Sequence, residues 1–287
     1  MTDNAKGAVL MMLSMLSFTI NDAAMKAASA SLPLGQQVFL RGLLVSVIFG
    51  WIVWRQGGHR QPFPRSDWAR VITRSLAEVA AAYFFLTALF NMPLANATAI
   101  LLLLPLVVSL AAHFILGETL GWRRLSAIAI GFVGMLFIVK PGTEGFNWAT
   151  VYGLVAVGCV TLRDLITRNM SKSISNSVVT FTVAICVTVA FGGYAMTEDW
   201  AKVDSASAFL LGIAVIAVCT GYYASVAVMR VGEVSFVAGF RYSSLLFSLF
   251  LGYAVFGEWP DGWTLFGAMI IVVAGLFMLW RQRAVTG

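Results

Sequence analysis

The sequence has little charge and few of the residues that build catalytic or metal centres. Only 11% of its 287 residues are charged, against about 25% in soluble globular domains, and it has two histidines. Its three cysteines lie far apart and form no CxxC pair, so neither a disulfide framework nor a metal site is indicated. No HExxH, aspartate-rich or Walker motif is present. We therefore expect no metal, no cofactor and no enzymatic activity, and no direct use of ATP.

Long hydrophobic stretches are abundant in the sequence. Hydrophobic residues make up 60% of it, and the apolar stretches match the roughly 20 residues that a membrane-crossing helix needs. Because these stretches show no period-2 alternation, they predict helices rather than barrel strands. We expect an all-α integral membrane protein with ten transmembrane helices. The expected spans lie near residues 6–28, 34–54, 68–91, 94–116, 122–139, 147–169, 177–196, 207–230, 234–256 and 262–280.

The basic residues predict how these spans are oriented. The net charge of +6 is not gathered in a patch or tail, which argues against a nucleic-acid partner. With both termini in the cytoplasm, twelve basic residues fall on the inside and three on the outside, as the positive-inside rule requires. The outside residues are Lys26, Lys140 and Lys202. The inside residues are Lys6, Arg55, Arg60, Arg65, Arg70, Arg123, Arg124, Arg168, Lys172, Arg230, Arg281 and Arg283. Four arginines within or at the margins of the spans need another reason: Arg41, Arg74, Arg163 and Arg241.

The two halves of the chain repeat one another. GETLGWRRLSAIAIGFVGMLFI from Gly117 matches GEWPDGWTLFGAMIIVVAGLFML from Gly257, and TINDAAMK from Thr19 matches TLRDLITR from Thr161. We place the repeats at 1–141 and 142–287. Each half has five expected spans, an odd number, so the second half must be inverted relative to the first. Inverted repeats of this kind are typical of secondary transporters.

The repeat carries a resemblance to a known family. The best-matching marks are ALFNMPLANATAILLLLPLVVSLAAHFILGE from Ala88 to Glu118 and AVMRVGEVSFVAGFRYSSLLFSLFLGYAVFGE from Ala227 to Glu258. With two five-span halves, each ending in a GE turn and a glycine-rich helix, the chain resembles the EamA branch of the drug/metabolite transporter superfamily. Arg41 and Pro105 stand where that family often has an arginine and a proline, whereas Leu245 departs from the proline pattern.

The resemblance implies a ten-helix fold with a central cavity lined by both halves, and alternating access. It also implies a multi-pass protein of the bacterial inner membrane that moves a small organic metabolite. The chain is more similar to riboflavin-uptake members, which makes riboflavin our best single expectation. Exporters of amino acids or related metabolites stay open as the alternative. An intramembrane enzyme is the less favoured class, because the sequence offers no catalytic constellation.

Charged residues near the span ends suggest either local pairing or gates. Asp22 and Lys26 stand at i and i+4, where their side chains share a helix face and can pair. Asp164 and Arg168 repeat this spacing in the inverted half, near the opposite membrane face. A local ion pair that stabilises two charged side chains at a helix end would explain this pattern. A pair of gates, one at each membrane face, would explain it equally well. Glu118 and Glu258 we assign to the structure of the GE turns.

Other polar residues within the spans are candidates for a substrate cavity. An ionisable side chain inside the membrane is a functional candidate by default, and Arg41 and Glu78 are placed to pair with one another. Arg241 lies in a span that has no acidic residue. The further candidates are Gln36, Gln37, Tyr83, Asn96, Tyr222 and Tyr242. A cavity of aromatic, amide and hydroxyl groups suits a neutral or weakly charged planar solute. Membrane lipid is the other expected partner, and a homodimer stays open.

Overall fold

The computed structural model describes residues 3–57, 65–117, 121–140, 147–168, 170, 176–228 and 237–286. Throughout these residues the regular structure is helical. The first repeat contributes α1 (Asp3–Ala28), α2 (Leu34–Arg55), α3 (Arg65–Phe90), α4 (Leu94–Leu101), α5 (Leu104–Leu116) and α6 (Trp122–Val139). The second contributes α7 (Trp148–Arg168), α8 (Asn176–Ala195), α9 (Ser205–Val228), the 3₁₀ helix η2 (Gly239–Tyr242), α11 (Ser243–Phe256) and α12 (Gly262–Thr286).

The predicted all-α membrane fold is confirmed. Among the described residues, eight helical segments are long and apolar enough to cross a membrane, and α4 with α5 and η2 with α11 each count as one of them. Two shorter apolar helices, within α6 and α12, complete the ten. The span predicted at 122–139 agrees with α6 at both ends. The first three residues of the span predicted at 234–256 lie outside the described residues.

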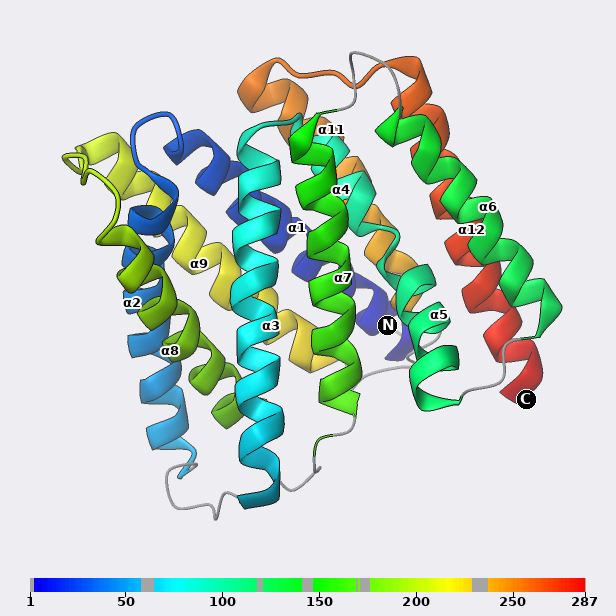
Figure 1. Ribbon diagram of the computed structural model, residues 1–287, viewed down its shortest axis with the longest axis horizontal. Coiled ribbons are helices and arrows are strands. Elements are labelled where there is room, and N and C mark those ends of the chain that lie inside the picture. Colours follow the sequence, from blue (N-terminus) through cyan, green and yellow to red (C-terminus); the bar gives the residue numbers. More distant parts are fainter. Residues whose placement is uncertain are drawn as a thin grey trace.

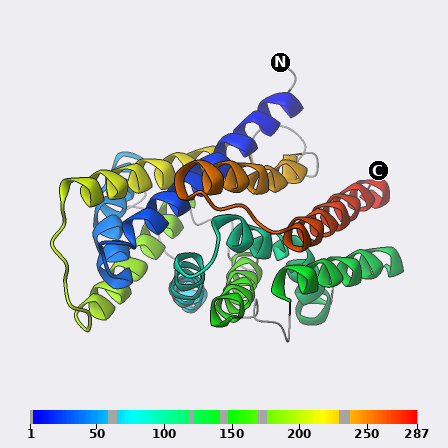
Figure 2. The ribbon, with the colours of Figure 1, turned by 90° about the horizontal axis from the view of Figure 1, so that it is seen from above.

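Helices of one repeat pack mainly on helices of the other. α2 packs along α8 and α6 along α12, and these pairs lie at opposite sides of the molecule (Figure 1). Between them, α1 packs along α9 and α3 along α7. Seen from above, α1, α9 and α11 form one layer, and α3, α7 and α6 lie below it (Figure 2). The first helix of each repeat thus contacts the third helix of the other, as an inverted two-fold arrangement requires.

The fourth span of each repeat is interrupted in the membrane. The span predicted at 94–116 is confirmed in its bounds, and within it Leu102 and Leu103 separate α4 from α5. Pro105 lies in the first turn of α5, and a proline cannot supply the amide that would continue the hydrogen bonding of α4. In the second repeat, the equivalent segment is the 3₁₀ helix η2, although no proline stands there. Interruptions of this kind commonly mark hinges.

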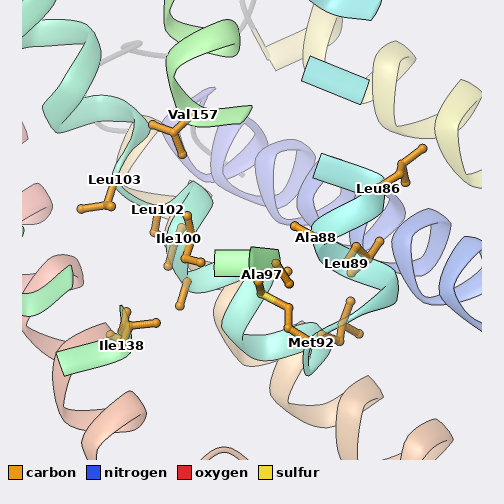
Figure 3. Close-up of a cluster of buried hydrophobic side chains, with 14 of the residues drawn as sticks. Leu86, Ala88, Leu89, Met92, Ala97, Ile100, Leu102, Leu103, Ile138 and Val157 are labelled. Carbon is orange, nitrogen blue, oxygen red and sulfur yellow. The ribbon is translucent and has the colours of Figure 1, made fainter. Parts of the chain in front are cut away.

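The hydrophobic core is centred on α4. Leu94, Ile100 and Leu103 are at most 1% exposed, and they pack with residues from the end of α3 and from α6 and α7 (Figure 3). Leu89 and Val157 belong to the same cluster. The short α4 is therefore held on several sides by apolar contacts. Its neighbours keep it in place despite the break that follows it.

The contact between α6 and α12 depends on glycine. A side-chain carbon at Gly134 would lie 2.8 Å from the carbonyl oxygen of Gly267, and a backbone atom cannot move aside as a flexible side chain can. Glycines let two membrane helices approach closely and gain van der Waals contact. Gly158, in α7, has nothing within 4 Å of the same position.

We expect Gly134→Ala to lower the free energy of unfolding by about 1–3 kcal/mol, since the added methyl group overpacks a closed interface. The measurement is thermal or chemical denaturation of the purified protein in detergent. Gly158→Ala makes the same chemical change in open space, where the helix propensity of alanine should leave stability equal or slightly higher. Equal effects of the two substitutions would contradict the assigned packing.

Candidate functional site

A cavity of about 100 Å³ lies between the two repeats. α2 and α3 of the first repeat form one wall, and α8 and α9 of the second form the other. Most of the lining is apolar, with aliphatic residues from α2, α8 and α9. Against this background, Arg41, Arg74 and Glu78 bring charge into the cavity, and Tyr222 brings a hydroxyl group. The structure thus places the predicted Arg41, Glu78 and Tyr222 in one cavity.

Arg41 is linked to Asp22 through an amide. The Nη1 atom of Arg41 donates a hydrogen bond of 2.8 Å to the Oδ1 atom of Asn21 in α1. The Nδ2 atom of Asn21 in turn donates to the Oδ1 atom of Asp22 at 2.9 Å. Asp22 and Glu78 are the carboxylates whose charges act on Arg41. The guanidinium therefore has acidic groups near it, yet its own hydrogen bond goes to a neutral side chain.

Glu78 pairs with Arg163 and not with Arg41, which corrects the predicted pairing. The Nη1 atom of Arg163 lies 3.1 Å from the Oε2 atom of Glu78, and its Nη2 atom lies 2.8 Å from the Oδ1 atom of Asp164. Arg163 in α7 therefore joins two carboxylates, one from each repeat. Sequence reasoning assigned it no role, although an arginine directly before a candidate aspartate was the available signal.

Arg74 is a second residue that sequence reasoning left without a role. Its Nε atom donates a 2.9 Å hydrogen bond to the hydroxyl group of Thr167 in α7. Its Nη1 atom is buried and has no hydrogen-bond partner among the described residues. Because the side chain also lines the cavity, part of a charged group is available there for a further partner.

Aromatic rings close the wall beside these charges. Tyr222 in α9 contacts Phe49 with ring centres 6.0 Å apart, and Phe18 with ring centres 5.4 Å apart. Both contacts are edge-to-face, the arrangement that the charge distribution of aromatic rings favours. Phe18 belongs to α1, so this cluster ties three helices together next to Arg41.

Gln36 and Gln37 lie away from the cavity, where α2 begins. The side chain of Gln36 donates to the carbonyl of Ala201 at 2.8 Å and accepts from the amide of Ala201 at 2.9 Å. Gln37 donates to the carbonyl of Leu32 at 2.7 Å. The carboxylate of Glu198 accepts from the amides of Gly35 and Gln36 at the start of the same helix. These groups tie α2 to the segment between α8 and α9.

The remaining cavity candidates are spread over several places. Tyr83 contacts Tyr194 edge-to-face at 5.7 Å. Asn96 lies in α4, and its Oδ1 atom is buried with no hydrogen-bond partner among the described residues. Tyr242 is buried with its hydroxyl group against Gly275 of α12, while Arg241 is exposed, with Asp164 as the acidic group that acts on it. These four residues are not among those that line the cavity.

Lys26 pairs with Glu258 of the other repeat, not with Asp22 as predicted. Its Nζ atom lies 2.6 Å from the Oε1 atom of Glu258 and also donates to the carbonyl of Met92 at 2.6 Å. The Oε2 atom of Glu258 accepts from the amide of Leu94, the first residue of α4. We expected Glu258 only to stabilise the GE turn. Its side chain instead connects the end of α11 to Lys26 of α1 and to the first residue of α4. Tertiary partners thus replace the local i,i+4 contact.

This pair lies at the upper end of the molecule, defined here by the connections 29–33, 91–93, 196–204 and 257–261, at the top of Figure 1. The Lys26 side chain is 9% exposed there and that of Glu258 27%. Lys140 and Asp261 form a second pair between the repeats at the same end. At the upper end, polar contacts therefore cross from one repeat to the other.

Asp261 also caps α12, by accepting a hydrogen bond of 2.9 Å from the amide of Thr264. Partial burial alone would raise the pKa of Asp261. The hydrogen bond from Lys140, the amide of Thr264 and the charge of Lys140 outweigh this effect and hold the pKa below its ordinary value. The carboxylate therefore stays charged in its pair.

The predicted second gate is described only in part. Asp164 contacts Arg163, its neighbour in sequence. The side chain of Arg168 and the whole of Glu118 lie outside the described residues. Pairing of Asp164 with Arg168 therefore stays a prediction.

Comparison with known proteins places the chain among transporters. The sequence profile of the EamA-like transporter family matches twice, over residues 5–140 and 147–280. The S-adenosylmethionine uptake transporter of Rickettsia prowazekii is 27% identical over 67% of this chain and 65% of its own length. The riboflavin transporter of Vibrio cholerae is 25% identical over 97% of this chain and 94% of its own length. A crystal structure with 17% identity and a TM-score of 0.68 covers 99% of both chains, which shows the same fold.

We expect Lys26→Met to destabilise the protein by about 1.5–3 kcal/mol, because Glu258 then lies partly buried with no positive charge beside it. Denaturation of the purified protein in detergent measures the change. Lys6 offers a matched control, since its pair with Asp3 is more than half exposed on both sides. Lys6→Met should change stability by less than about 0.5 kcal/mol. Equal losses of stability in the two variants would show that the contact of Lys26 with Glu258 stabilises the protein no more than an exposed ion pair does.

Proposed function

The chain belongs to the EamA-like transporter family, and we propose that it is a secondary transporter that carries a small organic metabolite across a bacterial inner membrane by alternating access. The cavity between the repeats is the observation that carries this proposal. It draws one wall from each repeat and holds charged groups at a depth where charge is costly. Such a site suits a solute that is bound midway and released when the repeats move.

Alternating access follows from the inverted arrangement. In our proposal the upper end faces the outside, and both termini lie in the cytoplasm, as the distribution of basic residues predicts. Lys26 and Glu258 then form the outer gate, and their ion pair between the repeats supports this assignment. Asp164 and Arg168 stand at the inverted positions and would act when the inner end closes. The segments 1–141 and 142–287 are the two units that move.

Riboflavin is our first candidate substrate. Its flat ring could stack on the aromatic group formed by Phe18, Phe49 and Tyr222, and a relative that matches over nearly the whole chain is a riboflavin transporter. S-adenosylmethionine is the second candidate. A relative is named for its uptake, and the charged groups of the cavity could bind the charged ends of that molecule.

We expect saturable uptake of radiolabelled riboflavin or S-adenosylmethionine into liposomes that contain the purified full-length protein. Liposomes without protein provide the background, and excess unlabelled solute should suppress the flux. A wider panel of amino acids belongs in the same assay, because exporters of such compounds are the alternative. No saturable flux for any solute, despite correct folding in the liposomes, would contradict the transport function.

A further inference from the structure

Three arginines lie at or near the cavity, and among the residues that the structure describes Arg163 is the one that forms an ion pair. Arg163 is neutralised by Glu78 and Asp164. Arg41 and Arg74 both line the cavity, and among the described residues neither forms a salt bridge. Each instead donates to a neutral oxygen, on Asn21 and Thr167 respectively. The cavity therefore presents two positive groups whose direct hydrogen bonds do not go to a carboxylate.

From this arrangement we infer that the cavity binds an anionic oxygen group of the substrate, a carboxylate or a phosphate, between Arg41 and Arg74. The inference rests on the proposed transport function and narrows the class of substrate. It assigns Arg74, which the sequence left unexplained, as a substrate-binding residue. Among the two candidate substrates it favours S-adenosylmethionine, which carries a carboxylate, over riboflavin, which has none.

The energetic cost of charge inside a membrane supports a ligand for these arginines. An arginine or lysine at the centre of a membrane helix costs about 2.5–3.5 kcal/mol, so it is retained where it has a partner or a function. The Nη1 atom of Arg74 is buried without a hydrogen-bond partner among the described residues. An incoming anion would satisfy this donor and add a negative charge next to Arg41.

The lining carries more positive than negative charge. Glu78 is its acidic residue, against Arg41 and Arg74, and that carboxylate is already engaged by Arg163 from α7. Asp22 reaches Arg41 only through the amide of Asn21. Both carboxylates are therefore engaged by other side chains, and among the described residues neither accepts a hydrogen bond from Arg41 or Arg74.

The chemistry and the size of the cavity agree with this assignment. A guanidinium group is planar and presents parallel N–H donors, which match the two oxygens of a carboxylate or phosphate. The cavity volume of about 100 Å³ is well below the roughly 300–1,000 Å³ of typical ligand sites. In this conformation the cavity can hold one end group of a metabolite. The rest of the solute requires the repeats to move apart.

Two matched pairs of probes test the inference on the full-length protein. S-adenosylmethionine is compared with decarboxylated S-adenosylmethionine, and flavin mononucleotide with riboflavin, so that each pair differs at one anionic group. The readout is ligand affinity, measured from the shift in unfolding temperature in detergent, which does not depend on transport. In at least one pair, we expect the member that carries the anionic group to bind at least about tenfold more tightly than its partner, since charged hydrogen bonds contribute that much or more. The preferred pair identifies carboxylate or phosphate.

Variants locate the effect in the cavity. Arg74→Gln and Arg41→Gln should each weaken binding of the preferred probe that carries the anionic group by about 10- to 100-fold, and leave the partner that lacks this group nearly unaffected. Arg74→Gln keeps a polar group within reach of Thr167, which limits damage to the fold. Arg55→Gln serves as the control, because Arg55 is exposed at the end of α2 and stacks on Trp51. It should leave every affinity unchanged.

Several outcomes of these affinity measurements would contradict an anion site in the cavity. Equal binding within both pairs, tighter binding of the members that lack the anionic group, or no binding by any of the four probes would overturn the inference. Saturable riboflavin uptake together with equal binding within both pairs would overturn the inference while leaving the transport function intact. A lack of flux in liposomes bears on transport alone, because the affinities are measured separately.

Discussion

The cost of placing charge inside a membrane is the constraint on which this structure depends. Each ionisable group within the spans needs a partner or a polar cavity, and here the partners come largely from the opposite repeat. Lys26 meets Glu258 and Arg163 meets Glu78, so both ion pairs join the first half of the chain to the second. The polar contacts that make the charges tolerable are therefore the same contacts that hold the two repeats together.

These contacts lie in two places, at the upper end of the molecule and around the cavity. At the upper end, the pairs Lys26 with Glu258 and Lys140 with Asp261 cross between the repeats, and Glu198 accepts from the first amides of α2. Away from this end, the cavity lies where four helices meet, with arginines and aromatic rings on its walls. The interrupted fourth spans lie close to the apolar core, where a change of angle can be transmitted from one repeat to the other.

Sequence alone predicted the ten spans and the inverted repeat, because hydrophobic length and local sequence identity carry both signals. The sequence also predicted Arg41, Glu78 and Tyr222 as cavity residues, because polar residues are rare in apolar helices. The pairings could not be predicted: Lys26 and Glu258 are 232 residues apart, and the local Asp22 offered a plausible partner. Gln36 looked like a cavity residue because nothing in the sequence shows that its amide binds Ala201. The break after α4 was hidden in a continuous apolar run.

The central claim is that the two repeats move against one another about the cavity, and paired distance measurements test it most directly. Spin labels at Ala30 and Trp259 report the upper end, and labels at Gln56 and Thr167 report the lower end; all four positions are exposed. The distances are measured by pulsed electron paramagnetic resonance in liposomes, with and without transported solute. Our account predicts two populations, in which a longer upper distance accompanies a shorter lower one. Distances that stay fixed, or that lengthen together at both ends, would contradict it.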